Sequence, residues 1–188
     1  MIDFSQIIDH DTNNQRLILN FSHISSPLGS MVALSDDNNL YFLDFINQTR
    51  TLSRIQKLKS QLQAQIIQKT SKPIEAIQHE LNKYFNNNLS IFKTPIKFIG
   101  TPFQQKVWQA LMKIPYGQTC SYKELAQNIG KATAFRAAAN ANGANKFVII
   151  VPCHRVINTG GKLGGYSSGL IYKEKLLKLE SNAKNILI

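Results

Sequence analysis

Helix start and stop signals follow one another closely after residue 100, and they constrain the fold more than any other feature. Thr101-Pro102-Phe103-Gln104 is a capping box with proline at the first helical position, so it predicts a helix that stops at Pro115-Tyr116-Gly117. A second capping box, Ser121-Tyr122-Lys123-Glu124, predicts a short helix ending at Ile129-Gly130. A third helix is expected at about 133–142. Two short helices joined by a tight turn with glycine form a helix-turn-helix.

The third of these helices is rich in alanine. Its single charged residue is Arg136, and the alanines around it are Ala132, Ala134, Ala137, Ala138, Ala139 and Ala141. Small side chains let a helix backbone come close to another surface. The composition leaves two interpretations open, namely close packing against another helix and docking into a groove of DNA.

The first half of the chain is expected to be a small α/β module. Three strands are expected, at 16–22, 28–35 and 39–46. Two helices are expected, at 52–67 and 73–85. The turn residues 36–39 predict a hairpin, and Ser71 is expected to cap the last helix. Residues 86–98 resemble a linker. The sequence therefore predicts an α/β (α+β) protein with a small sheet-and-helix domain, 1–97, followed by a mainly helical domain, 98–188.

The positive charge of the chain is concentrated in its second half. The whole chain carries a formal net charge of +11, and residues 101–188 contain twelve Lys and Arg against three Glu, a net charge of +9. Such an asymmetry favours a polyanionic partner, nucleic acid above all, over a basic surface that only aids solubility. The apolar fraction of 43% is that of an ordinary globular protein, which excludes a mainly disordered chain.

Cysteine usage and hydropathy indicate the compartment. Cys120 and Cys153 are the two cysteines, too few for a disulfide framework, and they lack a zinc-binding spacing. We therefore expect a reducing compartment. The chain opens without a basic leader, and no apolar run approaches the roughly 20 residues of a membrane helix. These features predict a cytoplasmic protein with no membrane partner.

A possible centre of chemistry follows the apolar segment 147–151, which is expected to be a buried strand. This strand would lead into Pro152-Cys153-His154-Arg155. A thiolate is a strong nucleophile, and imidazole or guanidinium charge nearby lowers a cysteine pKa. Neighbours on an extended chain point to opposite sides, so His154 is expected to reach Cys153 through a bend or a water. An inert buried cysteine is the plainer alternative, and a Cys-His protease is a rival without its usual signature.

The segment Pro152-Cys153-His154-Arg155-Val156-Ile157 resembles the active-site motif of the methylated-DNA–protein-cysteine methyltransferases, the O6-alkylguanine-DNA alkyltransferases. Further motifs occur in the order typical of that family. They are Gly100-Thr101-Pro102-Phe103-Gln104, Val107-Trp108, Ile114-Pro115-x-Gly117-Gln118, Ser121-Tyr122-x-x-Leu125-Ala126, Arg136-Ala137, Asn142-Gly143-x-Asn145, Gly165-Tyr166-Ser167-x-Gly169 and Lys173-x-x-Leu176-Leu177-x-x-Glu180. The resemblance covers about residues 98–180.

The resemblance implies a DNA repair reaction that consumes the protein. Cys153 would take the alkyl group from O6-methylguanine, and from O4-methylthymine, in double-stranded DNA, in a single turnover. No cofactor and no metal would be needed, because the damaged base and the cysteine supply both reaction partners. The protein would act as a monomer.

The resemblance also implies roles for residues around the cysteine. His154 would act as a base toward Cys153 through a water, and Glu180 would hold its imidazole in the useful tautomer. Asn145 would fix the turn that carries the cysteine. Tyr122 would donate a hydrogen bond to the guanine ring and so stabilise the leaving purine.

Other residues would bind the DNA. Tyr166 and Ser167 would shape the base pocket, with the Ser167 hydroxyl near O6. Arg136 would fill the gap left when the nucleotide rotates out of the stack, a rotation that a buried sulfur requires. Ala137 and Ala138 would lie beside it on the helix that contacts the groove.

The sequence also departs from the family pattern. Phe135 and the run Ala137-Ala138-Ala139 replace the commoner Ala-Arg-Ala-Val-Gly context of Arg136, and Ser168 stands where glycine is common. Cys120 lacks the context of Cys153 and is expected to be a spare thiol. Two other classes of function are the alternatives: a non-catalytic module that binds alkylated DNA, and a sequence-specific DNA-binding regulator, for which an alanine-rich helix offers few groups to read bases.

Overall fold

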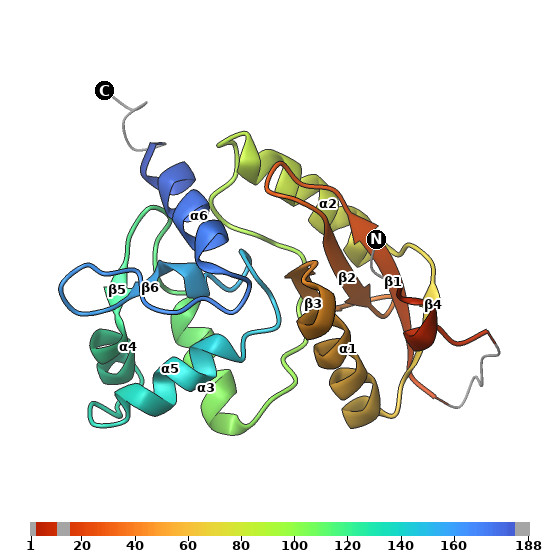
Figure 1. The fold of residues 1–188 in the computed structure, drawn as a ribbon, viewed down its shortest axis with the longest axis horizontal. Coiled ribbons are helices and arrows are strands. Elements are labelled where there is room, and N and C mark those ends of the chain that lie inside the picture. The colour runs from red at the N-terminus through yellow and green to blue at the C-terminus, as the bar shows by residue number, and fades with distance from the viewer. Residues whose placement is uncertain (1–2, 11–15, 183–188) are drawn as a thin grey trace. The chain divides into compact units, whose positions relative to one another are not determined.

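A computed structural model describes residues 3–10 and 16–182 of the chain (Figure 1). The chain divides into two compact units. The first comprises the residues up to Asn86 together with Phe92–Ile99, and the second comprises Asn87–Ile91 and the residues from Gly100 onward. The first unit is a mixed sheet with helices and the second is mainly helical, so the predicted α+β class is confirmed.

The first unit is built on a four-stranded sheet of order β3-β2-β1-β4. Its strands are β1 (Ile18–Ile24), β2 (Met31–Ser35), β3 (Leu40–Phe45) and β4 (Gln65–Gln68). The pairs β1–β2 and β2–β3 are antiparallel, and β1–β4 is parallel. The antiparallel pairing of β2 with β3 confirms the predicted hairpin. In its turn, one carboxylate oxygen of Asp36 accepts from the backbone N–H groups of Asn38 and Asn39, at 2.7 and 2.6 Å.

The helix predicted over 52–67 is wrong at both ends. Helix α1 spans Gln48–Leu62, and Gln63 ends it with a left-handed φ of 50°. The chain then enters β4, whose Ile66 is completely buried and donates its backbone N–H to the Asp9 carboxylate at 2.7 Å. Pairing with β1 therefore overrides the helical pattern of this glutamine-rich stretch.

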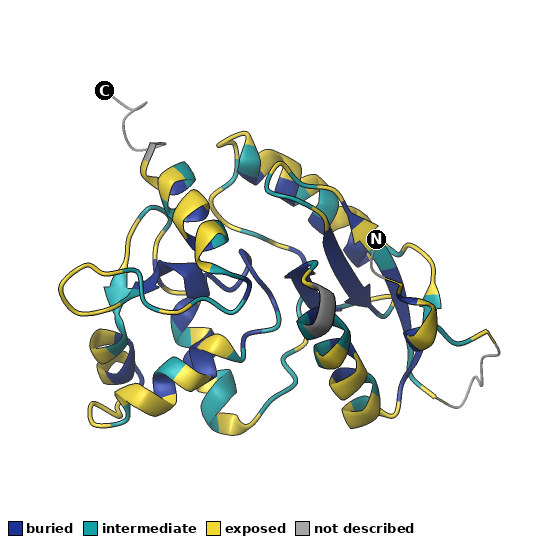
Figure 2. Cartoon of the chain, viewed as in Figure 1, coloured by how far each residue is buried: buried dark blue, intermediate teal, exposed yellow. Residues whose placement is uncertain are grey.

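The sheet is covered on both faces, because every residue of β2 and β3 is buried (Figure 2). One core cluster joins α1 and the short helix η1 (Ser5–Ile7) to the strands, with Leu19, Phe21, Val32, Leu34, Ile55 and Leu58 among its members. Helix α2 (Lys72–Phe85) buries Ile74, Ile77, Leu81 and Tyr84, and Ser71 caps it as predicted. Part of the expected linker runs beside β3, where the Leu40 N–H donates to Pro95 O at 2.8 Å.

The second unit is assembled from short elements. They are α3 (Pro102–Leu111), β5 (Cys120–Ser121), α4 (Tyr122–Asn128), α5 (Phe135–Gly143), η2 (Cys153–Arg155), β6 (Val156–Ile157) and α6 (Leu170–Asn182). Both predicted capping boxes are present. Helices α3, α4 and α5 pack against one another, and the buried Trp108 indole donates to Ala141 O at 2.8 Å. The predicted pair of short helices is therefore α4 and α5.

No helix in the part of the chain that the structure describes is long and apolar enough to span a bilayer.

Candidate active site

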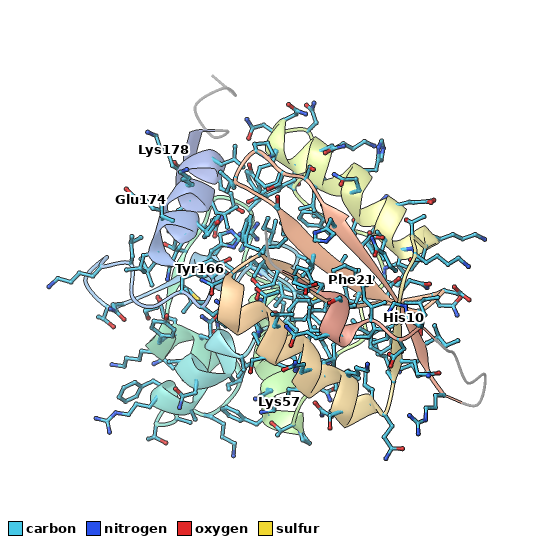
Figure 3. All side chains as sticks on the ribbon, turned by 45° about the vertical axis from the view of Figure 1, so that its right-hand side comes forward. His10, Phe21, Lys57, Tyr166, Glu174 and Lys178 are labelled. Carbon is cyan, nitrogen blue, oxygen red and sulfur yellow. The ribbon has the colours of Figure 1, made fainter. Side chains whose placement is uncertain are left out.

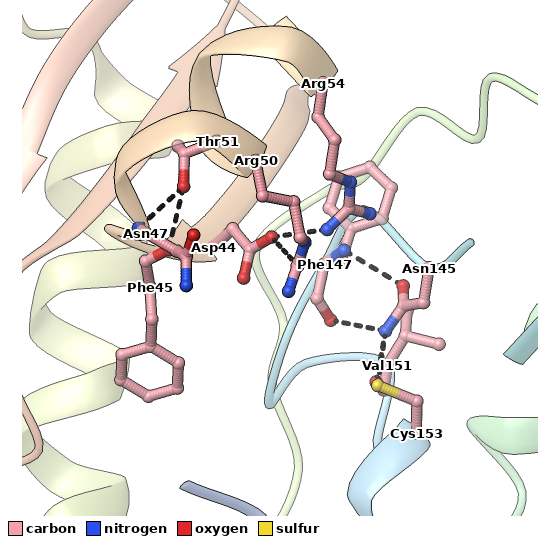
Figure 4. Close-up of polar contacts among 10 residues, drawn as sticks. All are labelled: Asp44, Phe45, Asn47, Arg50, Thr51, Arg54, Asn145, Phe147, Val151 and Cys153. Carbon is pink, nitrogen blue, oxygen red and sulfur yellow. Dashed lines mark hydrogen bonds and ion pairs between the residues drawn. The ribbon is translucent and has the colours of Figure 1, made fainter. Parts of the chain in front are cut away.

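A buried turn carries the cysteine, where the sequence predicted a strand. Residues 147–151 are buried, but Ile149 has a φ of 72° and the Val151 N–H donates back to Phe147 O at 3.0 Å. The Asn145 carboxamide donates to Phe147 O and Val151 O at 3.2 and 2.8 Å, and accepts from the Phe147 N–H at 2.9 Å (Figure 4). The strand prediction is wrong because this side chain satisfies backbone groups that a neighbouring strand would otherwise pair.

Cys153 is the first residue of η2, directly after this turn, and its exposed fraction is 1%. The Asn145 side-chain amide lies 3.1 Å from the Cys153 sulfur, which accepts its hydrogen bond. Asn142 donates to the Cys153 backbone carbonyl at 3.4 Å. The structure thus holds both the backbone and the sulfur of the cysteine with carboxamide groups from the end of α5 and the residues just after it.

His154 is completely buried, and its Nε2 lies 2.9 Å from Glu180 Oε1. The carboxylate can only accept, so Nε2 carries the proton and Nδ1 holds the lone pair. Nδ1 is buried and has no hydrogen-bond partner among the described residues. Burial lowers the pKa of His154 below 6.5, against the opposing effect of Glu180. The imidazole is therefore neutral, with its basic nitrogen unoccupied.

Arg155 neutralises Glu180 within the same cluster. Its Nε and Nη2 each lie 2.9 Å from a Glu180 oxygen, and its Nη1 donates to Ile114 O at 2.6 Å. The Gly117 N–H donates to Glu180 at 3.2 Å. Burial raises the pKa of Glu180, but the hydrogen bonds from His154 and Arg155, together with the Arg155 charge, outweigh it and hold that pKa well below the ordinary value. Glu180 is therefore an ionised carboxylate, whose charge the Arg155 guanidinium matches.

A pocket of about 560 Å³ opens in front of Cys153. Residues from α4, α5, η2 and the loop before α6 line it, namely Tyr122, Phe135, Arg136, Ala139, Asn140, Asn142, Gly143, Cys153, Asn158, Gly165, Tyr166 and Ser167. The Ser167 hydroxyl is a buried oxygen without a hydrogen-bond partner among the described residues. This volume lies within the range that accommodates one small ligand such as a purine base.

Parallel pairing of β5 with β6 brings Tyr122 to the pocket, since Ser121 pairs with Ile157 shortly after the cysteine. The Tyr122 hydroxyl donates to Gly165 O at 3.4 Å. Burial, and then the nearby Cys153, raise the pKa of Tyr122, so the phenol stays protonated. Gly164 has a φ of 67°, and a Cβ there would lie 3.2 Å from the Tyr122 ring, so this turn needs glycine.

Lys173 fixes the loop that supplies Tyr166 and Ser167. It is completely buried on α6, and its Nζ donates to Val156 O at 2.5 Å, to Leu163 O, and to Gly165 O at 3.4 Å. Desolvation lowers its pKa to about 8, against the opposing charge of Cys153. One backbone carbonyl from β6 and two from the loop between β6 and α6 therefore converge on one ammonium group.

The alanine-rich helix α5 separates into two faces. Ala138 and Ala141 are buried, whereas Arg136 and Ala137 are exposed. The prediction that Ala138 contacts DNA is corrected, because its exposed fraction is 0% and it packs inside the unit. The buried face of the helix therefore packs inside the unit, and the outer face is open to a partner.

Comparison with known proteins identifies the family. Residues 19–98 match the ribonuclease-like domain, and residues 102–182 the DNA binding domain, of the 6-O-methylguanine DNA methyltransferase family models. A methylated-DNA–protein-cysteine methyltransferase of Methanosarcina barkeri is 43% identical over 159 residues, which are 85% of this chain and 95% of that protein. The chain belongs to the methylated-DNA–protein-cysteine methyltransferase family.

Solved structures of this family have the same fold. Mycobacterium tuberculosis OGT, solved as a crystal structure in complex with DNA, is 38% identical in sequence to this chain. The two structures superpose with a TM-score of 0.75, and the match covers 87% of this chain and 94% of that one. The O6-methylguanine-DNA methyltransferase of Pyrococcus kodakaraensis is 25% identical, with a TM-score of 0.64 over 86% and 98% of the two chains. The resemblance predicted from the second half of the sequence is thereby confirmed, and it extends into the first half.

Sequence reasoning about the family site missed two residues that the structure places against it. Asn142 and Lys173 both belong to motifs that the sequence displays, but no role was assigned to either. The available signal was position: Lys173 lies seven residues before Glu180 and therefore on the same buried face of α6. Among residues 3–10 and 16–182, no three His, Cys, Asp or Glu side chains gather as ligands for a metal.

Proposed function

We propose that this protein repairs alkylated DNA by transferring the alkyl group of O6-methylguanine, and of O4-methylthymine, to Cys153, once per molecule and as a monomer. Membership of the methyltransferase family supports the reaction class. The observation that carries the assignment to Cys153 is its position in the lining of a base-sized pocket, one residue before the buried His154–Glu180 pair. The chain has two cysteines, too few for a disulfide framework, and this also supports a cytoplasmic location.

The transfer begins with loss of the thiol proton. Nδ1 of His154 is the available base, and a water between it and the sulfur relays the proton. The Asn145 amide, 3.1 Å from the sulfur, donates to the thiolate and so stabilises its charge. Glu180 keeps the His154 proton on Nε2 and thus keeps Nδ1 basic.

The thiolate then displaces guanine from the alkyl carbon. The new S–C bond forms as the C–O6 bond breaks, and the electron pair of that bond goes to the purine. The Tyr122 phenol donates to the ring, and Ser167 offers its unpartnered hydroxyl to O6. The proton lost by the thiol ends on guanine, so the products are guanine and an S-alkylcysteine. A thioether sulfur has no good leaving group, which makes the protein single-use.

The damaged nucleotide must leave the base stack before it reaches Cys153, whose exposed fraction is only 1%. Arg136 lies at the first turn of α5, is exposed, and lines the same pocket. It fills the space that the extruded nucleotide vacates, while Ala137 lets the outer face of α5 approach the minor groove.

Intact mass spectrometry tests this function directly. After mixing with a duplex that contains one O6-methylguanine, the protein should gain the mass of one methylene, located on Cys153 by peptide mapping. Binding without a change of mass would instead indicate a non-catalytic module. A parallel reaction with an O4-methylthymine duplex tests the second substrate.

A further inference from the structure

Phe135 is an exposed aromatic side chain at the start of an otherwise alanine-rich helix. It is the first residue of α5, and 46% of its surface is accessible. A single exposed hydrophobic residue is ordinary on a protein surface and by itself indicates nothing. Two further observations distinguish this one, namely its place in the pocket lining and its contact with Arg136.

The position of Phe135 on α5 places it at the mouth of the pocket. Phe135, Ala139 and Asn142 follow one another at helical spacing, and all three line the pocket. At a rise of 1.5 Å per residue, about 10 Å of helix axis separates Phe135 from Asn142. The Asn142 side chain donates a hydrogen bond to the Cys153 backbone carbonyl. Phe135 therefore lies at the end of the pocket-lining face of α5 that is farther from the reacting sulfur.

Phe135 also restrains Arg136. The Arg136 guanidinium lies over the Phe135 ring, with its central carbon 5.8 Å from the ring centroid, a distance at which cations and aromatic rings attract. No ion pair with an acidic side chain holds Arg136 in the described part of the chain. Contact with the ring therefore restrains this long side chain.

We propose that Phe135 and Arg136 act together as a two-part wedge, in which the ring stacks on the base pair beside the extruded nucleotide while the guanidinium occupies the vacated place. This inference rests on the proposed function, since it assigns a positioning residue to the same reaction. Proteins that enter the minor groove open base steps with apolar side chains such as phenylalanine. The ring is flat, exposed and adjacent to the arginine, as such a wedge requires, and it is far from the sulfur.

Single-turnover transfer rates on two substrates test the wedge. The substrates are a duplex with one O6-methylguanine and the same strand alone, which has no pair to open. Phe135→Ala should slow transfer from the duplex by roughly tenfold, and this loss should exceed the loss on the single strand by about fivefold or more. Phe135→Tyr keeps a flat ring and should restore most of the duplex rate. Met112→Ala removes a similarly exposed side chain outside the pocket lining and serves as the control.

A double-mutant cycle tests whether the two residues form one unit. If they do, adding Phe135→Ala to the Arg136→Ala variant should slow transfer from the duplex by a much smaller factor than Phe135→Ala does in the wild type. Equal losses on duplex and single strand would show that the ring only shapes the base pocket, and would overturn the proposal. Additive effects of the two substitutions would also overturn it. Failure of the wild type to transfer any methyl group would instead refute the proposed function itself.

Discussion

His154 and Glu180 are 26 residues apart in the sequence, yet Nε2 of the first lies 2.9 Å from Oε1 of the second. Nε and Nη2 of Arg155 each donate to an oxygen of the same carboxylate, at 2.9 Å. One buried carboxylate therefore sets the tautomer of the imidazole beside the cysteine and neutralises the only guanidinium in that cluster. Stability and, in the proposed reaction, proton transfer therefore depend on the same group.

Replacing Glu180 with glutamine should impair both properties. Glu180→Gln leaves Arg155 buried without a counter-charge, and removing one partner of a buried pair costs about 3–5 kcal/mol. The transfer rate should fall as well, because a neutral amide no longer fixes the proton on Nε2. Urea unfolding and single-turnover transfer measure the two effects. Glu174→Gln, on the exposed side of the same helix (Figure 3), is the matched control and should change neither. Unfolding of Glu180→Gln within about 0.5 kcal/mol of the wild type would contradict this account.

Acidification should destabilise the protein through His154. The folded-state pKa of His154 lies below 6.5. As the pH falls below 6.5, the imidazole therefore binds a proton in the unfolded chain while it stays neutral in the folded protein. The free energy of unfolding therefore falls as pH drops through about 6.5, by up to roughly 1.4 kcal/mol per pH unit for this group. Glu180 does not contribute to the pH dependence of stability near pH 6.5. Its folded-state pKa lies below the ordinary value of 4.5, so the stability that its ionised form contributes is lost only below about pH 4.5.

Urea unfolding of the wild type and His154→Gln at several pH values between about 5.5 and 7.5 measures this slope. The variant lacks the titrating ring, so its slope should be shallower than that of the wild type over the same range. Identical slopes for the two proteins would mean that other groups cause the pH dependence.

The helix boundaries that depend on local chemistry could be predicted from the sequence. The capping boxes at Thr101 and Ser121 and the cap at Ser71 form within a few residues, so neighbouring sequence suffices to predict them. Strand β4 was missed because its partner, β1, is more than forty residues away and its own sequence, Gln-Ile-Ile-Gln, continues a helical pattern. Such pairing is a property of the tertiary structure.

The site was predicted less completely than the helices. The identities of Cys153, His154 and Glu180 followed from a family motif, but the apolar run 147–151 pointed to a strand that does not form. Its turn depends on the Asn145 carboxamide and on the left-handed conformation of Ile149, which β-branched residues rarely adopt. Hydrophobicity alone carries no information about either feature.

The two cysteines should behave differently when each is replaced by serine. Cys153→Ser should abolish methyl transfer and retain DNA binding, because a hydroxyl is far less ionised than a thiol near neutral pH. Cys120→Ser should leave transfer intact, since burial raises the pKa of Cys120 to about 11 and keeps it a thiol. Intact mass after incubation with methylated duplex checks both variants. Methyl transfer by Cys153→Ser, or its loss in a folded Cys120→Ser, would refute the assignment.

Binding to undamaged DNA should be largely independent of sequence and should weaken with salt. Residues 101–188 carry a net charge of +9, and neutralising phosphates releases the counterions condensed on DNA. The outer face of α5 offers Phe135, Arg136, Ala137 and Asn140, of which only Arg136 and Asn140 carry hydrogen-bonding side chains. Base-edge readout therefore has few groups to use, and in the proposed reaction damage is detected by extruding the nucleotide.

Fluorescence anisotropy with several undamaged duplexes at a series of salt concentrations measures both properties. The dissociation constants should lie within roughly tenfold of one another, about 1.4 kcal/mol, because discrimination by two good bidentate base contacts, each worth about 1–3 kcal/mol, would exceed that spread. The salt slopes should be alike for all sequences, since the same phosphates are contacted each time. A strong preference for one undamaged sequence would favour a sequence-specific regulator instead. Affinity that does not change with salt would show that the basic residues of the second half do not face the DNA.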